Sequence, residues 1–259
     1  MKIERSTYFK DVLKMPGLSG REYMVGLPDG MPGIDLEKMT LKEIGDAAGW
    51  DADSMADGLT YIMEKASAEN IFYDYWDEEE RRQHPEKRET GLAVFLTGEK
   101  SKFIILVAGG GYRMVCSLVE SYPYVKRLNE MGYSVFVLKY RTYPYAAMPG
   151  PIEDLARAVS YITSHAGQFN VEATNYALCG ASAGGHLAAA FGTKSLGYQK
   201  YGVEKPSCLF LAYPFISYMD IGRTDTVNRM LERAFGERMH DEDLWRQYSI
   251  EEQVDEQYP

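Results

Sequence analysis

The chain has 259 residues, of which 45% are apolar and 25% are charged, and its formal net charge is −10 at pH 7. This composition is typical of a globular protein, and it excludes disorder, collagen and a coiled coil as descriptions of the whole chain. The excess of carboxylates repels nucleic-acid phosphates and anionic membranes, so neither nucleic acid nor a membrane is an expected partner.

The location of the protein is also constrained by its composition. No apolar run approaches the roughly 18 residues needed to cross a bilayer, and the N-terminal stretch MKIERSTYFKDV lacks the apolar segment of a signal peptide. Three cysteines, Cys116, Cys179 and Cys208, are too few for a disulfide framework. We therefore expect a cytoplasmic protein.

The first 70 residues differ from the rest of the chain. Residues 15–33 are rich in Gly and Pro, which is typical of loops. Thr40-Leu-Lys-Glu43 has the pattern of a helix capping box, and residues 54–66 place apolar side chains at helical spacing. We expect residues 1–70 to form a loop and helical extension, packed on a core domain of residues 71–259.

From residue 71 onward, short apolar runs alternate with helical patterns. The expected strands are 71–76, 92–96, 103–108, 134–140, 176–179 and 208–213, and the expected helices are 118–131, 152–165, 185–192, 225–235 and 241–248. This alternation predicts an α/β fold with a mostly parallel sheet and helices on both faces. No further buried strand is apparent after residue 216.

One Gly-x-Ser-x-Gly motif, Gly180-Ala-Ser-Ala-Gly184, lies between a predicted strand and a predicted helix. A serine at such a turn has a strained backbone, and its hydroxyl projects above the sheet at a helix N-terminus. Side chains at Gly180 or Gly184 would collide with the neighbouring backbone. The motif predicts that Ser182 is a catalytic nucleophile, and the alternative is a tight structural turn.

A second glycine cluster, Gly109-Gly-Gly-Tyr112, follows the predicted strand 103–108. Consecutive glycines let backbone amides approach a substrate carbonyl closely. We expect the amides of Gly110, Gly111 and Ala183 to form an oxyanion hole, the alternative being a glycine hinge. Among the aromatic residues, Tyr112 is the best placed to line a substrate pocket, although packing in the core is the alternative expected for most of them. Arg141 is a candidate for a buried ion pair that anchors the glycine loop.

These motifs resemble the α/β-hydrolase superfamily, specifically its esterases and lipases of the acetyl- and feruloyl-esterase type. The matching segments are AGGGY (108–112), LKYR (138–141), EDLARAVSYI (153–162) and CGASAGGHLAAA (179–190). The resemblance extends over residues 70–217. It implies hydrolysis of small acyl or aryl carboxylic esters through an acyl-serine intermediate, without a cofactor. Ala108 stands where many members have a histidine before the glycines.

The catalytic acid and base are not evident. In this family they follow the serine in the order Asp or Glu, then His, after two further strands. Those elements need on the order of 60 residues, more than residues 217–259 provide, so the C-terminal part that carries them is expected to be missing. His240 is the only candidate base within the chain, and a solvated position is the alternative. Histidine and cysteine spacing indicates no metal site.

Three hypotheses follow for the protein. The first is a serine esterase, with low turnover if the chain is complete. The second is an inactive hydrolase-like binding or regulatory protein. The third is that another chain, possible in a homo-oligomer, supplies the missing strands, because the sheet would otherwise end at an open apolar edge.

Overall fold

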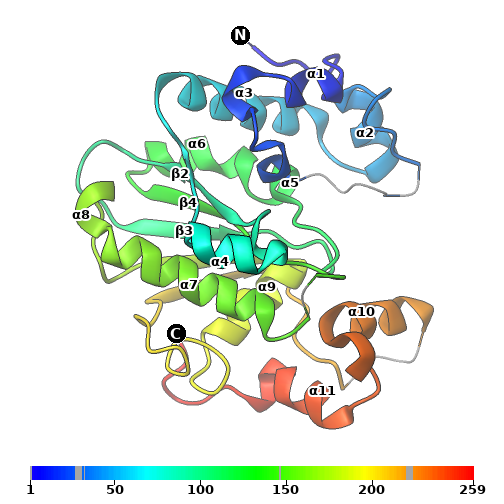
Figure 1. Ribbon diagram of the computed structural model, residues 1–259, viewed down its shortest axis with the longest axis vertical. Helices are drawn as coiled ribbons and strands as arrows, with labels where there is room; N and C mark the ends of the chain where they lie inside the picture. Colours follow the sequence, from blue (N-terminus) through cyan, green and yellow to red (C-terminus); the bar gives the residue numbers. More distant parts are fainter. Residues whose placement is uncertain (1, 27–30, 32, 146, 220–223) are drawn as a thin grey trace.

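The computed structural model describes residues 2–26, 31, 33–145, 147–219 and 224–259. Within them, six strands form one sheet in the order β1-β2-β4-β3-β5-β6 (Figure 1). The strands are β1 (Phe72–Tyr73), β2 (Gly91–Phe95), β3 (Phe103–Val107), β4 (Ser134–Lys139), β5 (Ala177–Ala181) and β6 (Cys208–Ala212). β2 is antiparallel to both of its neighbours, β1 and β4, and all other pairs are parallel. The predicted α/β-hydrolase type of fold, with a mostly parallel sheet, is confirmed.

The helices lie before, between and after these strands. In the N-terminal part they are α1 (Phe9–Leu13), η1 (Pro16–Leu18), η2 (Glu22–Val25), α2 (Leu41–Ala48) and α3 (Ala52–Ala68). After β1 they are α4 (Glu78–Gln83), η3 (Pro85–Lys87), α5 (Ser117–Glu120), α6 (Tyr122–Glu130), α7 (Gly150–Ser164), α8 (Ala166–Phe169), α9 (Ser182–Phe191), α10 (Asp225–Phe235), η4 (Gly236–Arg238), α11 (Glu242–Tyr248) and η5 (Ile250–Glu252). The η elements are short 3₁₀ helices.

One face of the sheet is covered by the N-terminal helices together with α5 and α6 (Figure 1). The expected capping box at Thr40 and Glu43 starts α2. Apolar residues of α3, such as Leu59, are fully buried in the same cluster as Phe95 of β2 and Val137 of β4. This shared core supports our proposal that residues 1–70 are an extension packed on the hydrolase core of residues 71–259.

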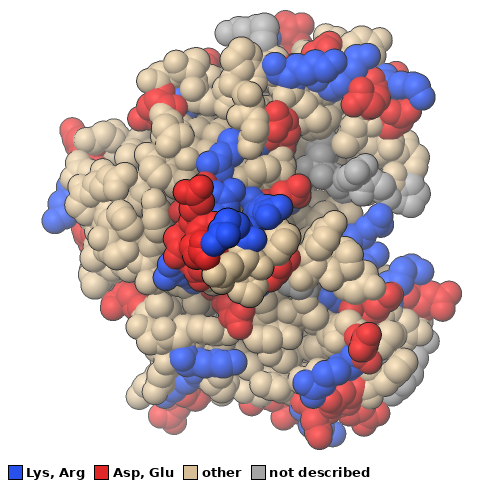
Figure 2. Space-filling model, in the orientation of Figure 1, with Lys and Arg blue, Asp and Glu red and all other residues tan. Residues whose placement is uncertain are grey.

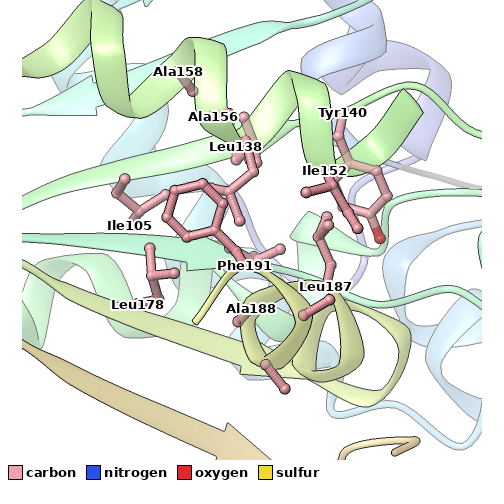
Figure 3. Packing of buried hydrophobic residues seen from close by; sticks show 14 of the residues in the cluster. Ile105, Leu138, Tyr140, Ile152, Ala156, Ala158, Leu178, Leu187, Ala188 and Phe191 are labelled. Carbon is pink, nitrogen blue, oxygen red and sulfur yellow. The ribbon is translucent and has the colours of Figure 1, made fainter. Parts of the chain in front are cut away.

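The other face is covered by α7 and α9. Figure 3 shows how Leu138 of β4 and Leu178 of β5 approach Ile152 of α7 and Phe191 of α9, all of them completely buried. Small residues dominate α9, so this helix packs closely against the sheet. The beginning of α9 is thereby held firmly against the strands below it.

The relative position of the two glycine motifs follows from strand register. β3 and β5 are parallel neighbours, and Val107 at the end of β3 pairs with Gly180 near the end of β5. Carboxyl ends of parallel strands lie at the same edge of a sheet, where α/β folds bind ligands. The segment after β3 therefore meets the turn after β5.

Two helix boundaries differ from the sequence-based expectation. The single helix expected over residues 118–131 is two helices, α5 and α6, with a break at Ser121. Pro123, the second residue of α6, has no amide hydrogen to bond the preceding turn. Helix α9 begins at Ser182 rather than at Gly185.

The last strand lies at one edge of the sheet. β6 pairs with β5 and with no other described strand. Phe210 in this strand is 70% exposed, and Tyr213 just after it is 68% exposed. The expectation of an open apolar edge is confirmed for the described residues. The hypothesis that another chain covers this edge stays a prediction, as does a homo-oligomer.

Candidate active site

Ser182 lies at a tight turn between β5 and α9. Its φ of 51° is in the left-handed region, which costs a residue with a side chain about 1–2 kcal/mol. A Cβ on Gly180 would come within 2.4 Å of the Gly184 carbonyl oxygen, and one on Gly184 within 2.0 Å of the Val107 carbonyl oxygen. Both collisions are with backbone, so the prediction that these positions require glycine is confirmed.

The glycine segment after β3 lies directly against this turn. A Cβ built on Gly109 would be 2.8 Å from the Cβ of Ser182 and 3.0 Å from the amide nitrogen of Ala183. Gly110 and Gly111 follow with φ values of 129° and 60°, a conformation that favours glycine. The structure therefore places Gly109 against Ser182 and Ala183, and Gly110 and Gly111 follow it directly in the chain.

The accessibility of these groups suits a reaction site. Ser182, Gly110 and Gly111 are partly exposed, whereas Ala183 and Gly109 are buried. The amides of Gly110 and Gly111 donate to no acceptor among the described residues. Such free amides can stabilise negative charge that develops on a substrate oxygen.

Side chains outside the two motifs fix the glycine segment. The Tyr140 hydroxyl donates to the Ala108 carbonyl oxygen at 2.8 Å. The Glu120 carboxylate accepts from the Gly109 amide at 2.5 Å through Oε2, and from the Tyr213 hydroxyl at 2.9 Å through Oε1. Sequence reasoning missed Glu120. Its only signal was a carboxylate in a helix that follows the glycines.

For Tyr112 the structure supports the packing alternative, and for Arg141 it confirms the buried ion pair but not its expected role in anchoring the glycine segment. Tyr112 does not line an open pocket, because it is only 4% exposed and its hydroxyl lies 2.6 Å from Nδ1 of His186. Arg141 does form a buried ion pair, with Asp154 at 3.0 Å. That pair joins the end of β4 to α7, however, while the glycine segment is held by Tyr140 and Glu120.

His186 is a packing residue of α9. Its Nε2 lies 2.8 Å from the Tyr248 carbonyl oxygen, which can only accept, so Nε2 carries the proton. Nδ1 then accepts from the Tyr112 hydroxyl. Complete burial lowers the pKa of His186 to about 4, so the ring is neutral at pH 7. Both ring nitrogens are occupied, and His186 cannot take a proton from Ser182.

None of the other histidines contacts Ser182 either. His240 is exposed between η4 and α11, so the structure does not join this candidate base to the serine. His84 pairs with Glu86, and His165 lies against the Tyr161 carbonyl oxygen. All four histidines lie in the described part of the chain, and no hydrogen bond links any of them to Ser182.

Two further surveys of the described residues bear on the site. They contain no group of three or more His, Cys, Asp or Glu side chains placed to hold a metal ion. None of their helices combines the length and the apolar character needed to span a bilayer.

Comparison with known proteins places these features in context. The family model described as BD-FAE matches residues 96–205. The acetylxylan esterase of Xylanibacter ruminicola is 33% identical over 127 residues, which is 49% of this chain and 25% of that protein. The endo-1,4-beta-xylanase B of Butyrivibrio fibrisolvens is 28% identical over 169 residues, 62% of this chain and 26% of that protein. The chain thus spans about a quarter of the length of these relatives.

Two solved structures have a similar fold over most of this chain. The acetyl ester-xyloside bifunctional hydrolase of Caldicellulosiruptor lactoaceticus superposes with a TM-score of 0.60 at 25% identity, covering 73% of this chain and 71% of that one. Esterase B of Lactobacillus rhamnosis superposes with a TM-score of 0.58 at 20% identity, covering 72% of this chain and 60% of that one. Given the sheet order, the serine turn and these similarities, the chain has the α/β-hydrolase fold and is similar to esterases with that fold.

Proposed function

We propose that the protein is a carboxylic ester hydrolase that uses Ser182 as its nucleophile. The observation that carries this proposal is the contact between the Ser182 turn and the glycine segment, with a Cβ on Gly109 only 2.8 Å from that of Ser182. A nucleophile and amide donors on one side of a sheet are the two components that acyl transfer requires.

The chemistry would proceed in two steps. The Ser182 oxygen attacks the ester carbonyl carbon and loses its proton, the alcohol leaves with a proton, and an acyl-serine remains. Water then attacks the acyl-serine and releases the acid. In each step the carbonyl oxygen becomes negatively charged, and the amides of Gly110, Gly111 and Ala183 would stabilise it.

The substrate class follows from similarity and is part of the proposal. Relatives that match this chain bear the names acetylxylan esterase and acetyl ester-xyloside hydrolase. We propose small acyl or aryl esters, acetyl esters first among them, with no cofactor. Metal would have no part in the reaction, because the proposed steps need only the serine, amide donors, a base and water.

Proton removal limits the expected rate. No histidine contacts Ser182 in the described residues, so a base is lacking in this arrangement. Serine hydrolases without one member of their triad retain roughly 10³- to 10⁴-fold acceleration over water, through oxyanion hole and binding. We expect slow but measurable hydrolysis by the 259-residue chain.

The test is hydrolysis of p-nitrophenyl acetate by the native chain and by Ser182→Ala, with and without added imidazole. We expect Ser182→Ala to abolish enzymatic hydrolysis, and imidazole to raise the rate of the native chain by supplying a base. Ser207→Ala is the matched control, since Ser207 is an exposed serine before β6. Equal rates for native chain and Ser182→Ala, after subtraction of the reaction of imidazole alone, would refute the proposal.

A further inference from the structure

Arg233 lies in the last turn of α10, at the glycine segment. Its Nη1 is 3.2 Å from the point that a Cβ on Gly111 would occupy. Gly111 has no side chain, so the guanidinium group lies against the backbone that supplies one of the proposed oxyanion donors. Arg233 is distant from Ser182 in the sequence, but in space it lies beside the glycine segment that contacts the Ser182 turn.

The guanidinium group of Arg233 makes no hydrogen bond or ion pair with a described residue, although the charge of the adjacent Glu232 acts on it. The adjacent carboxylate, Glu232, instead accepts from the Tyr143 hydroxyl at 2.9 Å. Arg141 shows the usual arrangement in this protein, because it pairs with Glu153 at 3.2 Å and with Asp154 at 3.0 Å.

Two further arginines lie near Arg233, although the chain as a whole is negative. Partial burial lowers the pKa of Arg233, the nearby charges of Arg113 and Arg229 lower it further, and Glu232 acts in the opposite direction. Figure 2 shows the surface hollowed at its right edge above α10, with Lys and Arg side chains on the lower rim and Asp and Glu side chains next to them. Gathering like charges in a partly desolvated place is unfavourable unless an anion binds there.

We propose that Arg233 binds a carboxylate of the ester substrate, so that the protein prefers esters carrying a negative charge close to the ester group. A guanidinium group offers a planar pair of donors that match the two oxygens of a carboxylate. Gly111 supplies one of the proposed oxyanion donors and lies against the Arg233 guanidinium group. The carboxylate and the ester group of the substrate are therefore expected to be joined by a short chain of two or three methylene groups.

This inference rests on the proposed ester hydrolysis, and its test uses pairs of esters that differ in charge. For the acyl side, p-nitrophenyl hemiglutarate is compared with p-nitrophenyl butyrate. For the alcohol side, 4-acetoxybenzoate is compared with phenyl acetate. We expect one of the two anionic esters to have a higher kcat/KM than its neutral partner. We expect Arg233→Gln to lower the ratio of the anionic to the neutral kcat/KM about tenfold, mainly by raising the KM of the anionic ester.

Two further variants make the result specific. Arg233→Lys keeps the charge but loses the paired donors, so we expect an intermediate ratio. Arg238→Gln removes the same charge from an exposed arginine that pairs with Asp241 at 2.6 Å, and we expect both ratios to stay unchanged. Ratios that do not respond to Arg233→Gln, or that fall equally with Arg238→Gln, would overturn the inference.

The inference and the proposed function can fail separately. If the neutral esters are hydrolysed as fast by Ser182→Ala as by the native chain, the proposed function fails. The inference is then decided by calorimetry, which measures how tightly each ester binds the Ser182→Ala chain. Methyl hemiglutarate is compared with neutral dimethyl glutarate, and 4-acetoxybenzoate is compared with neutral phenyl acetate. We expect at least one anionic ester to bind about tenfold more tightly than its partner, and Arg233→Gln to remove the difference. No charge preference in either pair would overturn the inference.

Discussion

At the scale of single residues, Glu120 links two parts of the candidate site. One carboxylate oxygen accepts from the Gly109 amide and the other from the Tyr213 hydroxyl. An ionised carboxylate that accepts two hydrogen bonds fixes both donors more firmly than a neutral group does. Glu120 does not face the proposed nucleophile directly, so its effect on the reaction would act through the position of the glycine segment.

We predict that Glu120→Gln lowers kcat about tenfold with little change in KM, because small displacements of oxyanion donors slow the chemical step. The amide of glutamine keeps one oxygen acceptor and loses the charge. Tyr213→Phe should have a smaller effect, since it removes only the second hydrogen bond. Steady-state kinetics on p-nitrophenyl acetate measure both variants.

The matched control for Glu120 is Glu130→Gln, which removes the same charge from an exposed helix position paired with Arg127 at 3.5 Å. It should leave kcat unchanged. A kcat for Glu120→Gln equal to that of the native chain would show that this carboxylate does not position the glycine segment.

Sequence reasoning at this scale succeeded for local signals and failed for distant contacts. Ser182 and the glycines were predicted because the strand, the turn and the helix that carry them are adjacent in the sequence. Glu120 and Arg233 were missed because their partners depend on tertiary packing. Arg233, for example, meets Gly111 only after α10 folds back over the end of the sheet.

At the scale of secondary-structure elements, one side chain ties α9 to both the glycine segment and α11. His186 of α9 accepts from Tyr112 and donates to the carbonyl oxygen of Tyr248, the last residue of α11. Because the ring is completely buried and neutral, folding must keep it unprotonated. The pKa of about 4 in the folded state lies below the ordinary value of 6.5.

The pH dependence of stability follows from this difference. Between pH 6.5 and 4 the unfolded chain binds a proton at His186 that the folded chain does not. The contribution of His186 to the free energy of unfolding is therefore complete above pH 6.5 and is lost as the pH falls toward 4. The loss amounts to about 3 kcal/mol at most. Urea unfolding at several pH values, for the native chain and for His186→Gln, measures this loss.

We expect the free energy of unfolding of His186→Gln to fall less steeply over that pH range than that of the native chain. Glutamine does not titrate, and only the pH slopes are compared, so a general loss of stability in the variant does not affect the result. Identical slopes would mean that His186 does not stay neutral in the folded protein.

Element prediction from the sequence was accurate where periodicity and capping agreed. Helix α10 has the predicted bounds 225–235, because an apolar stripe coincides with a threonine cap at its start. The break between α5 and α6 was missed because apolar spacing continues across Pro123. There the absent amide hydrogen of proline outweighs the periodic pattern.

At the scale of the whole molecule, two apolar clusters on opposite faces of the sheet hold the site in place. The N-terminal helices and α6 fill one side, and α7 and α9 fill the other. This double-sided packing supports both Ser182, the first residue of α9, and Gly109–Gly111, which follow β3. The open apolar edge could be expected from the sequence, whereas the order of the strands required the structure.

The central claim is that Ser182 is a nucleophile facing amide donors, and its most direct test is covalent labelling. The native chain and Ser182→Ala are incubated with a fluorophosphonate in the presence of imidazole, and the label is located by peptide mass spectrometry. The account predicts one phosphonyl group on Ser182 and no such group in the variant. A native chain left unlabelled at Ser182, or labelled only elsewhere, would contradict it.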